Sequence, residues 1–338
     1  MKSLSEFPRA SLAHRPTPLE PMPNVSADLG GPEVWVKRDD CTGLGMGGNK
    51  ARQLEFYFGD ALARGADTVL ITGAVQSNYV RATAAAAAKL GMGCEIQLEE
   101  RVAGMDETYR RSGNVLLDQI FGARLHSYPE GEDEGGADAE LEAIAERLRG
   151  EGRSPYVIHL AEGHRPLGAL GYVEAADEIL EQAAALDVAF DAIIVPSGSG
   201  ATHAGLLVGL RAAGSKVPVH GICVRRDVEA QAPRILRAAR ATEEELDAGE
   251  LVAASDIAVH DDWLAPGYGH PSESTLEAIR VAARREGLLL DPVYSGKAFA
   301  GLLGMARRGD FGPPARVLFV HTGGTPALFG YLTLLADL

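Results

Sequence analysis

The sequence predicts an α/β fold in which a largely parallel sheet carries helices on its faces. From Val34 onward, apolar runs rich in β-branched residues alternate with longer stretches rich in Ala and Leu, which is the pattern of strand–helix repeats. The chain has 338 residues, more than one hydrophobic core usually accommodates, so two packed domains are expected. Hydrophobic residues make up 46% of the chain and charged residues 23%, which is typical of a folded globular protein.

Seven apolar segments are predicted to be strands, and helices are expected in most of the gaps between them. The predicted strands are residues 34–37, 68–72, 94–98, 156–160, 192–195, 219–224 and 317–321. The helix that begins near Lys50 is expected to be amphipathic, because Leu54, Phe58 and Leu62 recur at intervals of four. It is expected to stop at Gly65.

Charge and hydropathy exclude two classes of partner. The formal net charge of −15 repels a phosphate backbone, and no run of Lys or Arg offsets it, so nucleic-acid binding is not expected. Residues 1–24 carry Pro and charge in place of the apolar core of a signal peptide. No stretch reaches the roughly 18 apolar residues that a membrane span requires. We therefore expect a cytoplasmic protein without a membrane partner.

The cysteines and histidines do not predict a metal site. Cys41, Cys94 and Cys223 are odd in number and widely separated, which fits reduced thiols. The nine histidines form no His-x-x-His or His-Glu-x-x-His pair, and the two Asp residues after His260 fit a solvated loop. Neither a metal nor a disulfide is expected.

Two further segments are expected to serve structure. Residues 129–138 are polar and rich in Gly and acidic side chains, which predicts a surface loop outside any cofactor site. Residues 83–88 are rich in alanine and are predicted to lie in a closely packed helix.

Four junctions between a predicted strand and the next helix are rich in small and polar residues. They are residues 43–50, 73–78, 196–202 and 321–325. Free backbone N–H groups and helix dipoles converge at such junctions in a parallel sheet, so ligands bind there. One junction alone fits a tight turn, but four together indicate a bound ligand. The third is expected to hold a phosphate.

Two classes of cofactor could occupy these junctions. A dinucleotide site requires Gly-x-Gly-x-x-Gly and an acidic residue about twenty positions further on. Gly198 and Gly200 match, but His203 takes the third glycine's place, and Arg225 and Arg226 follow the next strand. This argues against NAD and leaves NADP open. Pyridoxal phosphate requires a glycine-rich phosphate cup and one lysine that forms a covalent bond to it, and both are present.

Lys50 is the predicted cofactor lysine. The chain has six lysines: Lys2, Lys37, Lys50, Lys89, Lys216 and Lys297. Lys50 alone follows a glycine loop at the start of a helix, where burial and the helix dipole lower the pKa of an amine. Lys37, which precedes Arg38 and Asp39, is expected to form an ion pair.

This ordered set of motifs resembles the family of 1-aminocyclopropane-1-carboxylate deaminases, D-cysteine desulfhydrases and L-cysteate sulfo-lyases over nearly the whole chain. The matching segments are Pro-Thr-Pro-Leu-Glu at 16–20, Lys-Arg-Asp-Asp at 37–40, Gly-Gly-Asn-Lys at 47–50, Gln-Ser-Asn at 76–78, Gly-Tyr-Gly at 267–269, Asp-Pro-Val-Tyr at 291–294 and His-Thr-Gly-Gly at 321–324. The resemblance implies a tryptophan-synthase-β-like fold, pyridoxal-phosphate fold type II, with two open, mostly parallel sheets flanked by helices. It also implies a homodimer, with a larger cofactor-binding domain (1–50 and 166–338) and a smaller substrate-side domain (51–165) in each protomer.

The resemblance also assigns roles to individual residues. It implies that Lys50 binds the cofactor covalently and that Thr322 faces the pyridine nitrogen. The residues implied to be catalytic are Lys50, Ser77, Tyr268 and Tyr294. The implied cofactor contacts are Lys50, Asn49, Asn78, Ser197, Gly198, Ser199, Gly200, Ala201, Thr202 and Thr322. The implied substrate contacts are Gln76, Ser77, Asn78, Tyr79, His164, Arg165 and Ser295.

The chemistry that the resemblance implies is β-elimination from a small β-substituted amino acid. D-Cysteine is the leading substrate, giving pyruvate, ammonia and sulfide, and L-cysteate is the second. The deaminases carry Glu after the Tyr of Asp-Pro-Val-Tyr, where this chain has Ser295, so ring opening ranks third. A pyridoxal-phosphate-binding protein without turnover is a further alternative.

Three departures from the family pattern lie near the predicted site. Gln53 stands where the family commonly has Lys, and Tyr79 stands where it usually has His or Gln. Residues 162–165 read Glu-Gly-His-Arg where Gly-Gly-Ser-Asn is usual. Arg165 either binds an anionic β-substituent such as a sulfonate, or pairs with Glu162 or faces solvent.

Overall fold

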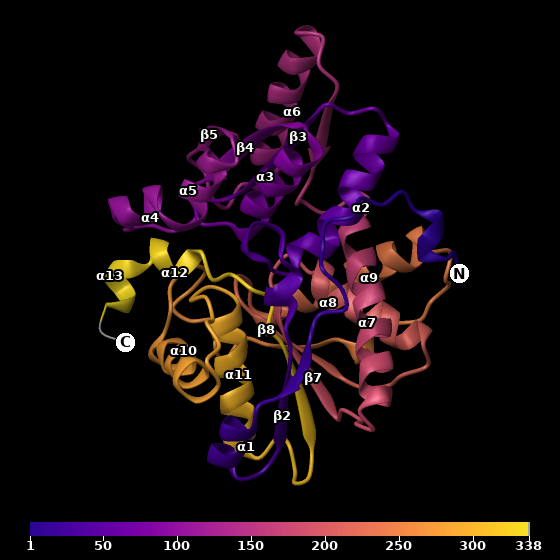
Figure 1. Cartoon of the computed structure of the whole chain (residues 1–338), viewed down its shortest axis with the longest axis vertical. Coiled ribbons are helices and arrows are strands. Elements are labelled where there is room, and N and C mark those ends of the chain that lie inside the picture. The colour runs from indigo at the N-terminus through magenta and orange to yellow at the C-terminus, as the bar shows by residue number, and fades with distance from the viewer. Residues whose placement is uncertain (337–338) are drawn as a thin grey trace.

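The computed structural model describes residues 1–336, which form two sheets of mostly parallel strands, one in each half of the molecule (Figure 1). In spatial order, the large sheet contains β1 (Leu19–Pro21), β2 (Glu33–Lys37), β10 (Arg316–Val320), β7 (Ala192–Ser197), β8 (Val219–Cys223) and β9 (Ala258–His260). The small sheet contains β5 (Arg124–Tyr128), β4 (Gly93–Glu99), β3 (Thr68–Ala74) and β6 (Pro155–Ile158). Among these strands only β1 runs antiparallel to its neighbour. The predicted fold class is confirmed.

Helices connect the strands along the whole described chain. They are α1 (Pro23–Leu29), α2 (Lys50–Ala63), α3 (Asn78–Leu90), α4 (Glu107–Arg111), α5 (Gly113–Ile120), α6 (Glu134–Gly150), α7 (Leu167–Ala185), α8 (Ala201–Ala212), α9 (Val228–Glu245), α10 (Glu273–Glu286), α11 (Ser295–Arg308), α12 (Ala327–Gly330) and α13 (Leu332–Leu335). Short 3-10 turns are η1 (Leu4–Glu6), η2 (Asp39–Thr42), η3 (Leu44–Met46) and η4 (Ala254–Asp256). None of the helices within residues 1–336 combines the length and the apolar character that crossing a bilayer would take.

The alternation of side chains along the large sheet separates two hydrophobic cores. Ile193 and Val195 of β7 pack in one core with α7, α8 and α9, whereas Ile194 faces the other core with α1, α10 and α11. Successive residues of a strand point to opposite faces, so both faces of a parallel sheet must be apolar and covered. The apolar runs that predicted these strands reflect this burial on both faces.

The small sheet is covered in the same way. The side chains of Val69 and Ile71 pack under α2 and α3, and Leu70 between them packs under Leu141 and Ile144 of α6. The alanine-rich segment predicted to pack closely lies in α3, where residues 84–87 are almost fully buried. Small side chains there let α3 approach its neighbours closely.

The seven predicted strands are confirmed, whereas β1, β5 and β9 were not predicted. All three are edge strands, and β1 and β9 have only three residues each. An edge strand needs fewer buried side chains, so its sequence carries a weaker apolar signal. The helix predicted from Lys50 is confirmed; it ends at Ala63, and Leu62 is 45% exposed. The proposed division into domains 1–50 with 166–338 and 51–165 stays a prediction.

The prediction of a surface loop over residues 129–138 was wrong from residue 134 onward. Helix α6 begins there because the side chain of Asp133 caps it, accepting a hydrogen bond from the backbone N–H of Gly136 at 2.9 Å. Ala137 and Leu141 then bury one face of the helix. The acidic residues favour the start of a helix because they lie at the positive end of its dipole.

Candidate active site

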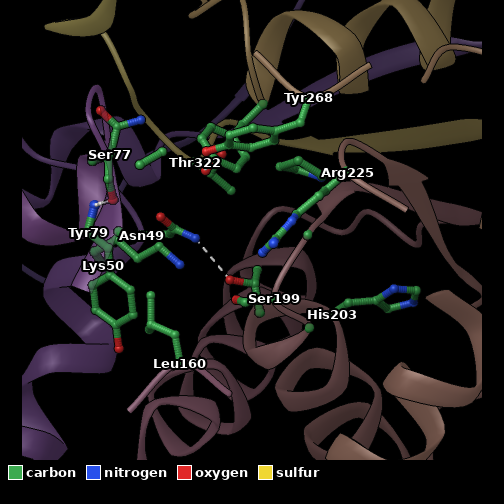
Figure 2. Close-up of a pocket in the computed structure, with 18 of the residues that line it drawn as sticks. Asn49, Lys50, Ser77, Tyr79, Leu160, Ser199, His203, Arg225, Tyr268 and Thr322 are labelled. Carbon is green, nitrogen blue, oxygen red and sulfur yellow. Dashed lines mark hydrogen bonds between the residues drawn. The ribbon is translucent and has the colours of Figure 1, made fainter. Parts of the chain in front are cut away.

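A cavity of about 920 Å³, counting the space open to solvent at its mouth, lies where all four predicted junctions converge (Figure 2). Its walls come from both halves of the molecule. Twelve of the predicted site residues line it: Asn49, Lys50, Ser77, Asn78, Tyr79, Gly198, Ser199, Gly200, Thr202, Tyr268, Tyr294 and Thr322. The carboxyl ends of β3 and β7 open into this space, as expected for ligand sites in parallel sheets.

The amine of Lys50 enters this cavity from the first turn of α2. Its Nζ donates a hydrogen bond to Oε1 of Gln53 at 3.3 Å and lies 4.5 Å from the ring centroid of Tyr79. Burial lowers the pKa of Lys50 to about 8, because removal from water penalises the charged amine. A substantial fraction of this amine is therefore neutral and nucleophilic near pH 8.

The other buried lysines are committed to structural contacts. Nζ of Lys37 lies 2.5 Å from Glu178, which confirms the expected ion pair. Lys297 also has its pKa lowered to about 8 by burial, but its Nζ donates to the carbonyl oxygens of Leu264 and Gly267 at 2.7 and 2.6 Å. Among the described residues that line the cavity, Lys50 is the one lysine.

The glycine loop before Lys50 is tied tightly to the loop after β10. The backbone N–H of Asn49 donates to the carbonyl oxygen of Thr322 at 3.0 Å. A Cβ added to Gly323, whose φ is +84°, would lie 2.6 Å from Cα of Gly48. The two backbones approach so closely that this position requires glycine. This contact places Lys50 and Thr322 near one another in the wall of one cavity.

Arg81 of α3 holds the same glycine loop from behind. It is buried and donates to the carbonyl oxygens of Gly45 and Gly47, the latter at 3.1 Å. Its Nε donates to Oδ1 of Asn114 at 3.2 Å, and Asn114 in turn donates to Oδ1 of Asn78 at 2.9 Å. A continuous network therefore connects the first and second junctions.

The second junction presents the amino end of α3 to the cavity. Ser77 is the N-cap residue, and its Oγ accepts hydrogen bonds from the backbone N–H groups of Tyr79 and Val80 at 3.2 and 3.4 Å. The positive end of the helix dipole therefore faces the cavity wall that contains Ser77 and Asn78. Such a wall can bind a carboxylate.

The third junction forms the expected phosphate cup at the start of α8. Gly200 has a φ of +105°, which turns the chain into the helix, and the free N–H groups of a helix's first turn are available beside the cavity that Gly198, Ser199, Gly200 and Thr202 line. Oγ1 of Thr202 accepts hydrogen bonds from Nδ2 of Asn49 at 2.9 Å and from Nε2 of Gln53 at 2.8 Å. Gln53 therefore connects the lysine to the cup.

An arginine cluster beside the cup was not predicted as part of the site. Arg225, Arg226 and Arg234 line the cavity and surround one carboxylate, that of Glu134 from α6. Arg234 also donates to the carbonyl oxygen of Ser199 at 3.1 Å. Burial disfavours the charged form of Glu134, but the arginines outweigh it and lower its pKa. Segment 129–138 thus contributes to the cavity, contrary to the prediction.

One signal in the sequence was available for this cluster. Arg225 and Arg226 closely follow β8, at the end of a strand where ligands bind in a parallel sheet. Glu134 and Arg234 come from segments far from any junction motif, so only the folded structure connects them with the cup. Arg101, which ion-pairs with Glu99 at 2.7 Å, also lines the cavity. Its place there likewise follows from the folded structure and from no junction motif.

The two predicted tyrosines meet in the cavity wall, where Arg225 of the arginine cluster lies near Tyr268. The hydroxyl oxygens of Tyr268 and Tyr294 lie 2.6 Å apart, and burial raises the pKa of both phenols. The carboxylate of Asp291 accepts hydrogen bonds from the backbone N–H groups of Val293 and Tyr294, both at 2.8 Å. The Asp-Pro-Val-Tyr motif is therefore a turn that Asp291 organises around Tyr294.

Three predicted residues lie behind the cavity wall and three lie elsewhere. Behind the wall, Ser295 donates from its Oγ to Asp291 at 2.6 Å, Gln76 holds the backbone at Tyr109 and Ser112, and Ser197 is paired with His203 and Gln231. Ala201, His164 and Arg165 line a neighbouring cavity. The positions of these six residues do not support their predicted roles as contacts of the cofactor or substrate.

Arg165 pairs with neither of the partners that were considered. Its guanidinium is 49% exposed and donates to both carboxylate oxygens of Glu245, at 3.1 Å for Nε and 2.5 Å for Nη2. Glu162 pairs instead with Arg237 at 3.0 Å. The side chain of Arg165 is therefore engaged at the surface, away from the cavity that contains Lys50.

The residues in the cavity fit pyridoxal phosphate. Lys50 provides an amine with a lowered pKa, the cup at Gly198, Ser199, Gly200 and Thr202 provides backbone donors, and three arginines provide positive charge for a phosphate. Thr322 lies in the wall and is 6% exposed, and its contact with a pyridine nitrogen stays a prediction.

Comparison with known proteins agrees with this chemistry. Residues 10–323 match the family described as pyridoxal-phosphate dependent enzyme. The chain is 45% identical to a D-cysteine desulfhydrase of Salmonella choleraesuis (strain SC-B67) over 328 residues, which is 97% of each chain. A crystal structure of an ACC deaminase homologue superposes with a TM-score of 0.88 at 40% identity, covering 99% of this chain and 97% of the other.

A more distant structure shares the fold alone. The L-serine ammonia-lyase of the fungus Rhizomucor miehei superposes with a TM-score of 0.68 at 21% identity, over 97% of this chain and 99% of that one. Fold type II is thereby confirmed. The amine of Lys50, the phosphate cup and these similarities lead to one conclusion: the chain belongs to the pyridoxal-phosphate-dependent enzymes, in the family that includes the D-cysteine desulfhydrases.

Proposed function

We propose that the protein is a D-cysteine desulfhydrase, which converts D-cysteine and water to pyruvate, ammonia and hydrogen sulfide. The observation that carries the proposal is the amine of Lys50, with its lowered pKa, facing a phosphate cup and a tyrosine pair in one cavity. The similarity to a D-cysteine desulfhydrase over 97% of the chain supports this substrate. Pyridoxal phosphate, when bound, supplies the electron sink that makes the Cα proton of an amino acid removable.

Each wall of the cavity has a proposed task in this reaction. The N–H groups at the cup, with Arg226 and Arg234, hold the phosphate. Ser77 and the amino end of α3 bind the substrate carboxylate, which orients the Cα proton toward Lys50. The neutral amine of Lys50 then removes that proton.

The tyrosine pair has the proposed task of assisting the leaving group. Both phenols keep their protons at neutral pH because burial raises their pKa. The hydrogen bond between Tyr268 and Tyr294 leaves the second hydroxyl proton free to point into the cavity. That proton can be donated to the thiolate as the bond between Cβ and sulfur breaks.

The activity is tested by incubating the purified holoenzyme with D-cysteine, L-cysteine, L-cysteate and β-chloro-D-alanine. Sulfide and pyruvate are measured for the cysteines, sulfite and pyruvate for L-cysteate, and pyruvate alone for chloroalanine. We expect the highest kcat/KM for D-cysteine among the first three. A Lys50→Ala variant serves as the inactive control. Absence of turnover with every substrate would leave a cofactor-binding protein and reject the proposal.

One observation favours L-cysteate as a second candidate substrate. Arg101 and Arg225 line the cavity, and both lie close enough to Tyr268 to lower the cost of negative charge there. A sulfonate on Cβ would meet these guanidinium groups, which suit oxyanions. Glu134 and Glu99 already pair with them, so D-cysteine remains the leading proposal.

A homodimer is also proposed, as the family resemblance implies. Ile120 of α5, Phe329 of α12 and Leu332 of α13 are 66%, 58% and 60% exposed, and α12 packs against both α5 and α4. Apolar side chains exposed together on adjoining helices favour a protein–protein contact. Sedimentation velocity should give twice the chain mass, and a Phe329→Glu variant should shift it toward the monomer. The cytoplasmic location stays a prediction.

A further inference from the structure

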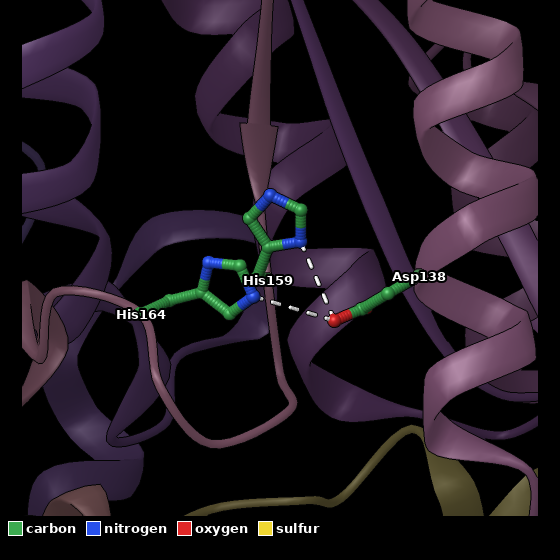
Figure 3. A group of neighbouring side chains, drawn as sticks. All are labelled: Asp138, His159 and His164. Atoms are coloured by element: carbon green, nitrogen blue, oxygen red, sulfur yellow. Dashed lines mark ion pairs between the residues drawn. The ribbon is translucent and has the colours of Figure 1, made fainter.

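A carboxylate and two imidazoles outside the active-site cavity point at one common position (Figure 3). Asp138 lies in the second turn of α6, His159 directly follows β6, and His164 lies in the loop that leads to α7. Oδ2 of Asp138 lies 3.4 Å from Nδ1 of His159 and 3.6 Å from Nε2 of His164. The two imidazole rings are stacked, with centroids 3.7 Å apart.

These separations match the spacing of ligands around a small metal ion. In a tetrahedral zinc site, with metal–ligand bonds of about 2.0–2.1 Å, neighbouring ligand atoms lie about 3.3–3.5 Å apart. The three ligand atoms of Asp138, His159 and His164 all lie within 4.8 Å of one another. The rings are nearly parallel, so they must rotate substantially for both lone pairs to meet one ion, and His164, 45% exposed, has room to turn.

The hydrogen bonding of His159 supports a cation at this position. Nε2 of His159 lies 3.0 Å from Oε1 of Glu142, so the ring N–H at that position faces a carboxylate. Nδ1, the opposite nitrogen, is buried and makes no hydrogen bond, although it faces Asp138. Histidine ligands of metals commonly donate their second ring N–H to a carboxylate, which directs the other nitrogen's lone pair at the metal.

A single proton satisfies fewer of these three ligand atoms than a metal ion does. One proton on Nδ1 of His159 could bridge that nitrogen to Asp138, but Nε2 of His164 faces the same carboxylate oxygen. A single divalent ion satisfies all three ligand atoms at once. Two imidazoles and one carboxylate form a ligand set that suits zinc and related transition metals rather than magnesium or calcium.

We propose that Asp138, His159 and His164 bind one divalent transition-metal ion, for which Zn²⁺ is the probe of choice. The ion fastens the segment from His159 to Arg165 against α6. Leu160, inside that segment, lines the active-site cavity, and Glu134, at the start of α6, lies in the arginine cluster. Metal binding therefore fixes two parts of the active-site wall, and the proposal holds whichever amino acid is the substrate.

The holoenzyme is first treated with a chelator, and the chelator is then removed. The test is a calorimetric titration of this protein with ZnCl₂ in the absence of amino acids. We expect one equivalent of Zn²⁺ per chain. His164→Ala and Asp138→Asn should each weaken this binding about a hundredfold, and Glu142→Gln, which alters only the outer carboxylate, about tenfold. Binding of Co²⁺ to the wild type should give the visible absorption bands of a tetrahedral site.

The matched control is His260→Ala. His260 belongs to another close histidine pair, with its Nε2 3.0 Å from Nδ1 of His220. Within the described residues, this pair does not form a three-ligand group with a carboxylate. This variant should bind Zn²⁺ as the wild type does. The proposal is overturned if the wild type binds no Zn²⁺, or if His164→Ala binds it with unchanged affinity and stoichiometry. Circular dichroism of each variant separates loss of the site from loss of the fold.

Discussion

The hydroxyl oxygens of Tyr268 and Tyr294 lie 2.6 Å apart in the wall of the active-site cavity, and each tyrosine comes from a different loop. Asp291 orders the turn at Tyr294, whereas Lys297 holds the carbonyl oxygen of Gly267 next to Tyr268. Two separate anchors thus bring the phenols into contact. With both phenols protonated, one proton bonds the pair together and the other remains available to a ligand.

Replacement of either tyrosine by Phe should slow elimination according to the leaving group. A thiolate requires protonation, and general acid catalysis contributes about 10²–10⁴-fold, so kcat for D-cysteine should fall by about a hundredfold or more. Chloride leaves without a proton, so turnover of β-chloro-D-alanine should change by less than about tenfold. Steady-state kinetics of Tyr268→Phe and Tyr294→Phe on both substrates measure this difference. Equal losses on both would assign the pair a packing role.

Gln53 should contribute to cofactor binding through its bridge between Lys50 and Thr202. Removal of the amide in Gln53→Ala leaves two buried polar groups without this partner, at about 1–3 kcal/mol each, so the Kd for pyridoxal phosphate should rise by about tenfold or more. Absorbance titration of apoprotein measures it. Thr202→Val breaks the same contact, so the double variant should lose less than the sum of the single losses. Additive losses would show that the bridge does not act as a unit.

The reaction of apoprotein with pyridoxal phosphate should report the pKa of Lys50. Only the neutral amine attacks, so the rate should rise about tenfold per pH unit below the pKa and level off above it. Burial lowers that pKa to about 8, compared with 10.5 for an exposed lysine. Stopped-flow absorbance from about pH 6 to about pH 10 gives the midpoint of this pH dependence, which is the pKa of Lys50. A rate that still climbs tenfold per unit above pH 9, roughly one unit past the expected midpoint, would contradict it.

Arg225 and Arg165 should differ sharply in their effect on an anionic substrate. A charge-assisted hydrogen bond contributes about 1.5–3 kcal/mol, so Arg225→Ala should lower kcat/KM for L-cysteate by about tenfold to a hundredfold. Arg165→Ala should leave it unchanged, because that guanidinium is bound to Glu245 at the surface. If the wild type does not process L-cysteate, sulfonate recognition by Arg225 is rejected. If Arg165→Ala alone reduces activity, the surface pairing of Arg165 is misassigned.

The sequence could predict the parts of the fold whose residues are buried on both sides. The runs that became β3 and β7 are apolar at nearly every position, because both faces of these strands pack against helices. The polar edge strand β5 lacks that signal, as its side chains are partly exposed. Helix α6 was missed in part because acidic residues at a helix start look like a loop when the buried face begins only at Ala137.

The active site likewise contains residues that the sequence could predict and residues that it could not. Residues at the starts of helices, such as Lys50, Ser77 and Thr202, could be found because the local pattern of glycines and small polar residues marks the junctions before these helices. Glu134 could not, because its role depends on arginines about ninety to a hundred residues away in the chain. Arg165 was expected near the substrate because it lies in the segment where the chain departs from the family pattern, and its pairing with Glu245 is a tertiary contact that no local pattern predicts.

Borohydride reduction of the holoenzyme, followed by peptide mass mapping, tests the central claim most directly. Lys50 is the lysine that lines the cavity, so the reduced cofactor should be found on the peptide that contains Lys50 and on no other. Lys50→Ala should fold normally, since alanine is well tolerated at a helix start, and should carry no covalent cofactor. An adduct on Lys297, which shares the lowered pKa, or on Lys37 would contradict the assignment of Lys50.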